Sequence, residues 1–109
     1  MSYKSQLFID GAWVDPVLKG TFENRNPSND AVLGNVANGT KEDIDIAVAS
    51  ARRCLESPHW GYKSTGAQRA VILRKLGEII SNRQEEIAQL DSIDQGKPMR
   101  EARADLADS

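Results

Sequence analysis

Apolar residues at helical spacing run through most of residues 40–109, and this pattern constrains the fold more than any other feature of the chain. It predicts one helix starting at Thr40 and a longer one starting at Thr65 and stopping at Gly96. Both starts, Thr40-Lys41-Glu42-Asp43 and Thr65-Gly66-Ala67-Gln68, resemble capping boxes. The apolar positions are Ile44, Ala47, Val48, Ala51 and Leu55, and then Leu73, Leu76, Ile80, Ile87 and Leu90.

A third helix is expected after Gly96. Pro98 suits its first position, where the missing N–H costs nothing, and Met99, Ala102 and Leu106 continue the apolar spacing. No glycine, proline or basic last turn closes this helix before Ser109. We therefore expect the sequence to be cut short within the third helix.

The first third of the chain, residues 1–39, has the pattern of strands and turns. Asp10-Gly11 separates two short apolar runs, and this dipeptide favours the positive φ angles of a type I′ hairpin turn. Residues 21–25 and 31–37 predict two more strands around the turn-forming residues 26–30. Hairpins followed by three helices predict an α+β fold over residues 1–109.

Charge and apolar run length exclude several classes of partner. The formal net charge is −2, spread evenly along the chain, so no basic stripe is available for nucleic-acid phosphates. The longest apolar run, Val71-Ile72-Leu73, is far too short to span a membrane. The single cysteine cannot form an internal disulfide, which fits a cytoplasmic location.

Few residues carry recognisable chemistry. Cys54 is interpreted as a small core or half-buried residue, and the lone His59 as a turn or packing residue, so no zinc site is expected. Neither glycine-rich phosphate-binding motif is present. Asp105 and Asp108 are three residues apart on one helical face, where a solvated surface is favoured over a charged site. The residues alone therefore indicate an α+β unit without an active site of its own.

The order of these features resembles the N-terminal part of the aldehyde dehydrogenase superfamily. The resemblance runs from Leu7 to Ser109, and within it the second half is most similar to the betaine-aldehyde and aminoaldehyde dehydrogenases. The matching stretches are residues 7–13, Asn26-Pro27-Ser28, Thr40–Ile44, Ala47–Arg52, Trp60, Arg69-Ala70, Leu73–Leu76, Leu90–Pro98 and Glu101-Ala102.

The resemblance implies that the whole protein has an α/β, Rossmann-like fold and oxidises an aldehyde with NAD or NADP. It also implies thiolate attack, hydride transfer and thioester hydrolysis. The residues that perform these steps in the family lie further along the chain, so no catalytic or cofactor-binding residue is expected within residues 1–109. Further implied partners are the rest of its own chain and a second copy, in a homodimer or homotetramer.

Two sites follow from the resemblance. Asp94 and the backbone carbonyl of Arg25 match positions that bind a structural Na⁺ or K⁺ in many relatives, although Asp94 is an equally good candidate for a helix-end hydrogen bond to backbone. Asp105 and Asp108 match acidic positions at the substrate entrance of aminoaldehyde-type relatives, where they would attract a cationic aldehyde.

A second interpretation is a stand-alone, non-catalytic α+β interaction module. An open reading frame that continues past Ser109 favours a segment of an enzyme, and a genuine stop codon favours the module. A helical DNA-binding protein is disfavoured by the even charge.

Overall fold

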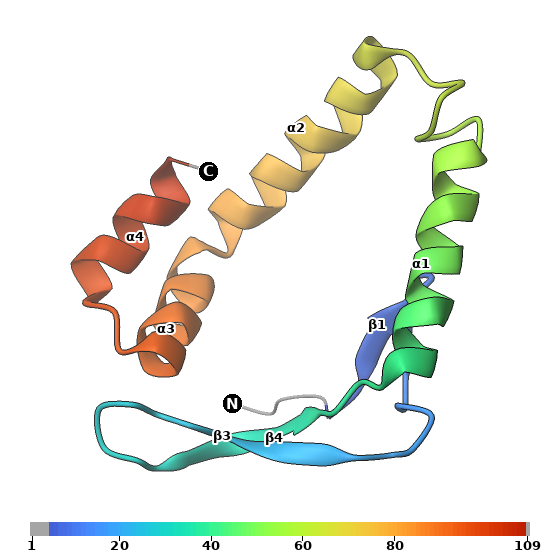
Figure 1. The fold of residues 1–109 in the computed structure, drawn as a ribbon. Helices are drawn as coiled ribbons and strands as arrows, with labels where there is room; N and C mark the ends of the chain where they lie inside the picture. Colours follow the sequence, from blue (N-terminus) through green and yellow to red (C-terminus); the bar gives the residue numbers. More distant parts are fainter. Residues whose placement is uncertain (1–4, 109) are drawn as a thin grey trace.

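The computed structural model describes residues 5–108, which form four strands followed by four helices (Figure 1). This order confirms the α+β class. The strands are β1 (Leu7–Ile9), β2 (Ala12–Val14), β3 (Thr21–Arg25) and β4 (Val32–Ala37), and the helices are α1 (Lys41–Glu56), α2 (Gly66–Asn82), α3 (Gln84–Gln95) and α4 (Met99–Ala107).

The predicted first hairpin is confirmed. β1 and β2 pair antiparallel through Leu7↔Val14, Phe8↔Trp13 and Ile9↔Ala12. Asp10 and Gly11 have φ angles of 55° and 78°, as a type I′ turn requires. The Phe8 and Trp13 rings meet edge to face, with centroids 5.1 Å apart.

The second hairpin joins β3 to β4 and forms a separate two-stranded sheet. Its register runs from Thr21↔Ala37 to Arg25↔Val32, with an irregularity after Asn24. In the connecting turn the Asn26 side chain accepts a hydrogen bond from the Ser28 N–H at 2.9 Å, as expected for this turn-forming cluster.

Helix α1 starts where the sequence predicted, and Asp43 secures its start. The Asp43 carboxylate accepts hydrogen bonds from the Thr40 N–H at 2.8 Å and from the Thr40 hydroxyl at 2.9 Å. Its other oxygen accepts from the Val17 N–H at 3.0 Å. Asp43 therefore ties the segment after β2 to the first turn of α1.

The prediction of three helices is wrong, because the long second helix is broken at Arg83 into α2 and α3. Arg83 has φ −113° and ψ 14°, and its guanidinium pairs with Glu86 at 2.7 Å. The preceding Asn82 favours non-helical backbone, while Glu85 and Glu86 stabilise a new helix N-terminus. The apolar spacing continues across the break, so the spacing alone could not show it.

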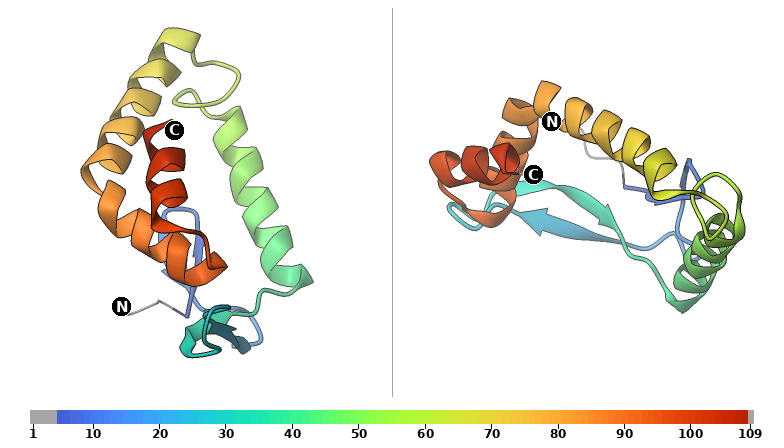
Figure 2. Two further views of the ribbon diagram at one scale, coloured as in Figure 1. Left: turned by 90° about the vertical axis from the view of Figure 1, so that its left-hand side faces the viewer. Right: turned by 90° about the horizontal axis from the view of Figure 1, so that it is seen from above.

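The described chain is open rather than compact. Figures 1 and 2 show that helices α1 and α2 diverge from the loop over residues 57–65. Helices α3 and α4 and the β3–β4 hairpin lie at the end of the molecule opposite this loop. The radius of gyration is 17.0 Å, whereas a compact domain of this length has about 13 Å. Within residues 5–108, the buried hydrophobic residues are all alanines: Ala37, Ala88 and Ala102.

Because no further layer covers α1 and α2 in the described chain, Cys54 is exposed on α1. Its interpretation as a core or half-buried residue is therefore wrong for the described chain. No helix within residues 5–108 has the length and apolar character needed to cross a membrane.

Candidate functional site

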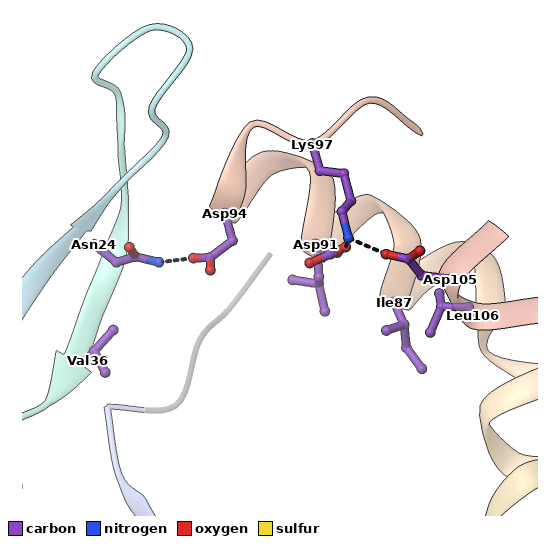
Figure 3. A pocket seen from close by; sticks show the side chains of 9 residues that line it. Asn24, Val36, Ile87, Asp91, Asp94, Lys97, Asp105 and Leu106 are labelled. Atoms are coloured by element: carbon purple, nitrogen blue, oxygen red, sulfur yellow. Dashed lines mark hydrogen bonds and ion pairs between the residues drawn. The ribbon is translucent and has the colours of Figure 1, made fainter. Parts of the chain in front are cut away.

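A cavity of about 660 Å³ opens where the β3–β4 hairpin faces α3 and α4 (Figure 3). Its apolar wall comes from the hairpin and from the two helices. Its polar rim carries three carboxylates and one ammonium. The apolar residues are Val36, Ile87, Leu90 and Leu106, and the polar ones are Asn24, Asp91, Asp94, Lys97 and Asp105. Two of the four residues implicated by the resemblance, Asp94 and Asp105, line this cavity.

The two turn motifs of the sequence pack against each other beside this cavity. Gly96 closes α3 in the left-handed conformation with φ 72°, as predicted, and a side chain there would place its Cβ 3.2 Å from Cγ of Pro27. The next helix differs slightly from its predicted start, because Pro98 is the residue before α4 and Met99 is its first residue. The end of α3 at Gly96 therefore packs against the turn at Pro27.

We expect Gly96→Ala to destabilise the fold by about 1–2 kcal/mol, because a β-carbon disfavours positive φ, and by more if Pro27 cannot move aside. Urea unfolding measures the loss. Gly11→Ala is the matched control, since Gly11 also has positive φ (78°) but open space around its Cβ position. Equal losses for the two variants would show that the contact with Pro27 contributes nothing.

Asp94 meets the hairpin across the mouth of the cavity. One carboxylate oxygen accepts a hydrogen bond from the side-chain amide of Asn24 at 2.5 Å, although the two residues are 70 positions apart. Asn24 directly precedes Arg25, so the structure brings Asp94 to the strand end that carries the second proposed cation ligand. This hydrogen bond joins two side chains, rather than Asp94 to backbone at its own helix end as the alternative interpretation has it.

The Arg25 side chain is engaged elsewhere. Its guanidinium pairs with Glu23 at 2.6 Å and donates to the Asp30 carbonyl at 2.9 Å. Over residues 5–108, no group of three or more His, Cys, Asp or Glu side chains is arranged to hold a metal ion.

Lys97 connects the two helices on the opposite side of the cavity. Its ammonium lies 3.5 Å from an Asp91 carboxylate oxygen and forms an ion pair with Asp105. The hydrogen bond to Asp105, together with the charges of Asp105 and Asp91, raises the pKa of Lys97. The charge of Asp105 is thus offset by a fixed cation.

Asp108 lies at the other end of the predicted acidic pair. It follows the last residue of α4, and its N–H donates to the Ala104 carbonyl at 3.1 Å. Asp105 lines the cavity, whereas Asp108 is not among the residues that line it. Sequence analysis missed Asn24, Asp91 and Lys97. Asn24 is 70 positions from Asp94, and the pairing of Lys97 with Asp105 depends on how α4 packs on α3.

The comparisons with known proteins agree on one family. The family model described as "Aldehyde dehydrogenase family" matches residues 13–109. The chain is 43% identical over 103 residues to aminoaldehyde dehydrogenase 2 of Solanum lycopersicum, covering 94% of this chain and 20% of that protein. It is 42% identical over 106 residues to the chloroplastic betaine aldehyde dehydrogenase of Beta vulgaris, covering 94% of this chain and 21% of that protein.

A solved structure is similar over nearly the same share of this chain. The crystal structure of betaine aldehyde dehydrogenase from Staphylococcus aureus in complex with NAD⁺ superposes with a TM-score of 0.90 at 36% identity. The superposition covers 96% of this chain and 21% of that one. The chain thus spans about a fifth of the length of the relatives it matches.

Proposed function

Since this chain belongs to the aldehyde dehydrogenase family, we propose that it is the N-terminal scaffold segment of a longer enzyme that oxidises an aldehyde to a carboxylic acid with NAD or NADP. One observation carries the proposal: almost the whole chain matches the family, yet it spans only about a fifth of its relatives. We assign no catalytic residue to residues 1–109.

The residues of this chain do not fit a nicotinamide dinucleotide. The sequence has no glycine-rich phosphate-binding motif, and the cavity rim carries three carboxylates against one ammonium, which disfavours a pyrophosphate. We therefore propose that the rest of the enzyme binds the cofactor. The NAD⁺ complex of the Staphylococcus aureus relative supports NAD as the cofactor of the whole protein.

Exposed apolar side chains support the scaffold role. Large apolar residues on helices α1 and α2 are about half exposed. Among them are Leu73 (55%), Leu76 (50%) and Ile79 (47%) on α2 and Val48 (59%) on α1. Patches of this kind mark surfaces that bind another protein surface. We propose that they pack against the rest of the same chain, and that the full-length enzyme is a homodimer or homotetramer in the cytoplasm.

The test is to compare the 109-residue chain with the same chain extended to the natural stop codon. We expect the extended enzyme to reduce NAD⁺ or NADP⁺ with an aldehyde from a panel, and the short chain to be inactive. Turnover by the purified short chain would refute the proposal. A short chain that is monodisperse and unfolds cooperatively would favour the alternative, a stand-alone interaction module.

We also propose two roles for residues in and around this cavity. The Arg25 carbonyl and Asp94 would contribute to a structural Na⁺ or K⁺ site, which the hydrogen bond from Asn24 to Asp94 supports by bringing β3 and α3 together. Asp105 and Asp108 would attract a cationic amino- or trimethylammonium aldehyde at the substrate entrance. Relatives named for aminoaldehydes and betaine aldehyde support this substrate class.

The double substitution Asp105→Ala/Asp108→Ala tests the entrance. In the full-length enzyme we expect the ratio of kcat/KM for a cationic to that for a neutral aldehyde to fall about three- to tenfold, because two partly screened attractions are lost. Steady-state kinetics with both substrates measure the ratio. An unchanged ratio contradicts this role of the two aspartates.

A further inference from the structure

We infer that Lys97 is a positioning residue that limits charge selectivity at the proposed substrate entrance, by holding an ammonium between Asp91 of α3 and Asp105 of α4. This inference rests on the proposed function of the entrance.

The backbone around Lys97 is fixed on both sides. Gly96 is held in the left-handed conformation against Pro27, and Pro98 restricts φ after it to −57°. The Ser92 hydroxyl donates to the Lys97 carbonyl at 2.7 Å. The side chain of Lys97 therefore starts from a well-defined position between the end of α3 and the start of α4.

The side chain itself is partly buried and faces two carboxylates (Figure 3). Lys97 and Asp91 side chains are 29% and 25% exposed, whereas Asp105 is 60% exposed. The Lys97 ammonium is therefore less exposed than the Asp105 carboxylate, and it pairs with that carboxylate at the rim of the cavity. A flexible surface lysine would not offset this carboxylate so consistently.

A second ion pair fixes α3 and α4 independently of Lys97. Arg103 of α4 pairs with Glu85 of α3 at 2.8 Å, and the Gln84 side chain donates to the Arg103 carbonyl at 3.1 Å. Removal of the Lys97 ammonium therefore leaves the two helices connected. Its main effect is on charge, because the rim then carries three carboxylates with no cation among its lining residues.

The experiment uses the full-length enzyme with Lys97→Met, which keeps an unbranched side chain, and Lys97→Arg, which keeps the charge. The substrates are a trimethylammonium aldehyde and its neutral isostere with a tert-butyl group. We expect Lys97→Met to lower KM for the cationic aldehyde about two- to fivefold, the range of a surface charge interaction, and to leave KM for the neutral one unchanged. The effect should vanish near 1 M salt, where the Debye length is about 3 Å.

Lys63→Met is the matched control, because Lys63 is exposed in the loop between α1 and α2 and is not among the residues that line the cavity. Three results would overturn the inference. They are equal KM changes for both substrates in Lys97→Met, the same change of selectivity in Lys63→Met, and a lower KM for the cationic aldehyde in Lys97→Arg. If Lys97→Met does not fold, Asp91→Asn replaces it and must raise KM for the cationic aldehyde alone. A wild-type enzyme that oxidises no aldehyde refutes the proposed function itself, whereas an active enzyme with unselective variants refutes only the role of Lys97.

Discussion

Alanine in place of Gly61 is expected to lower folding stability by about 3 kcal/mol or more, because its methyl carbon would lie 1.5 Å from the carbonyl oxygen of Leu55. The loop after α1 folds back over the last turn of that helix at this point. The Tyr62 N–H donates to the same Leu55 carbonyl at 2.9 Å, and the buried Ser64 hydroxyl donates to the Gly61 carbonyl at 2.7 Å. Neither side of the contact can move without loss of these hydrogen bonds.

In the full-length enzyme, the expected readout is a lower urea midpoint, followed by circular dichroism. Gly77→Ala is the matched control, since a β-carbon at Gly77 would meet nothing within 4 Å of the described residues. In the 109-residue chain this control should raise the helix content slightly, because alanine favours a helix interior over glycine by about 1 kcal/mol. A Gly61→Ala variant as stable as the wild type would show that the loop does not cross α1 as described.

Replacement of Asp43 is expected to cause the second largest loss, several degrees in Tm at neutral pH. Asp43 is only 4% exposed, and its carboxylate accepts the N–H groups of Thr40 and Val17. Asp43→Ala leaves these two backbone donors without their acceptor and removes the cap of α1. Asp45→Ala, which removes an exposed carboxylate paired with Lys41 in the same helix, is the control and should change Tm little.

The effect of Asp43 should also depend on pH. The hydrogen bond from the Thr40 N–H, and then that from the Val17 N–H, lowers the pKa of Asp43 in the folded chain. The ionised carboxylate therefore stabilises the fold above the unfolded pKa of about 3.9, and this contribution is lost as the pH falls through the lower folded pKa. The Tm difference between wild type and Asp43→Ala should be constant above about pH 5 and shrink in stronger acid. A difference that grows on acidification would contradict this assignment.

The sequence was sufficient where a structure depends on residues close together in the chain. The type I′ turn at Asp10-Gly11, the start of α1 at Thr40 and the left-handed Gly96 were all predicted, because dihedral preference and local hydrogen bonds decide them. The start of α2 belongs to the same class: the Thr65 hydroxyl accepts from the Gln68 N–H at 3.2 Å.

Features that depend on distant residues were not predictable in the same way. The break at Arg83 depends on neighbouring residues, but it leaves the apolar spacing in phase, so periodicity could not reveal it. Asn24 and Asp94 meet only because the β3–β4 hairpin lies beside α3, and Lys97 joins Asp91 to Asp105 only because α4 folds back on α3. The exposure of Cys54 depends on which other elements pack on α1, and the spacing within one helix cannot indicate that.

The pairing of each strand with the next one in the chain has a consequence for the order of folding. Both hairpins close through short connections, and β4 ends at Ala37, before α1 begins at Lys41. Structure of this local kind forms in microseconds, much faster than a ribosome adds amino acids. The two hairpins can therefore form during synthesis before any helix has left the ribosome, and the β3–β4 hairpin gains a packing surface when α3 and α4 emerge.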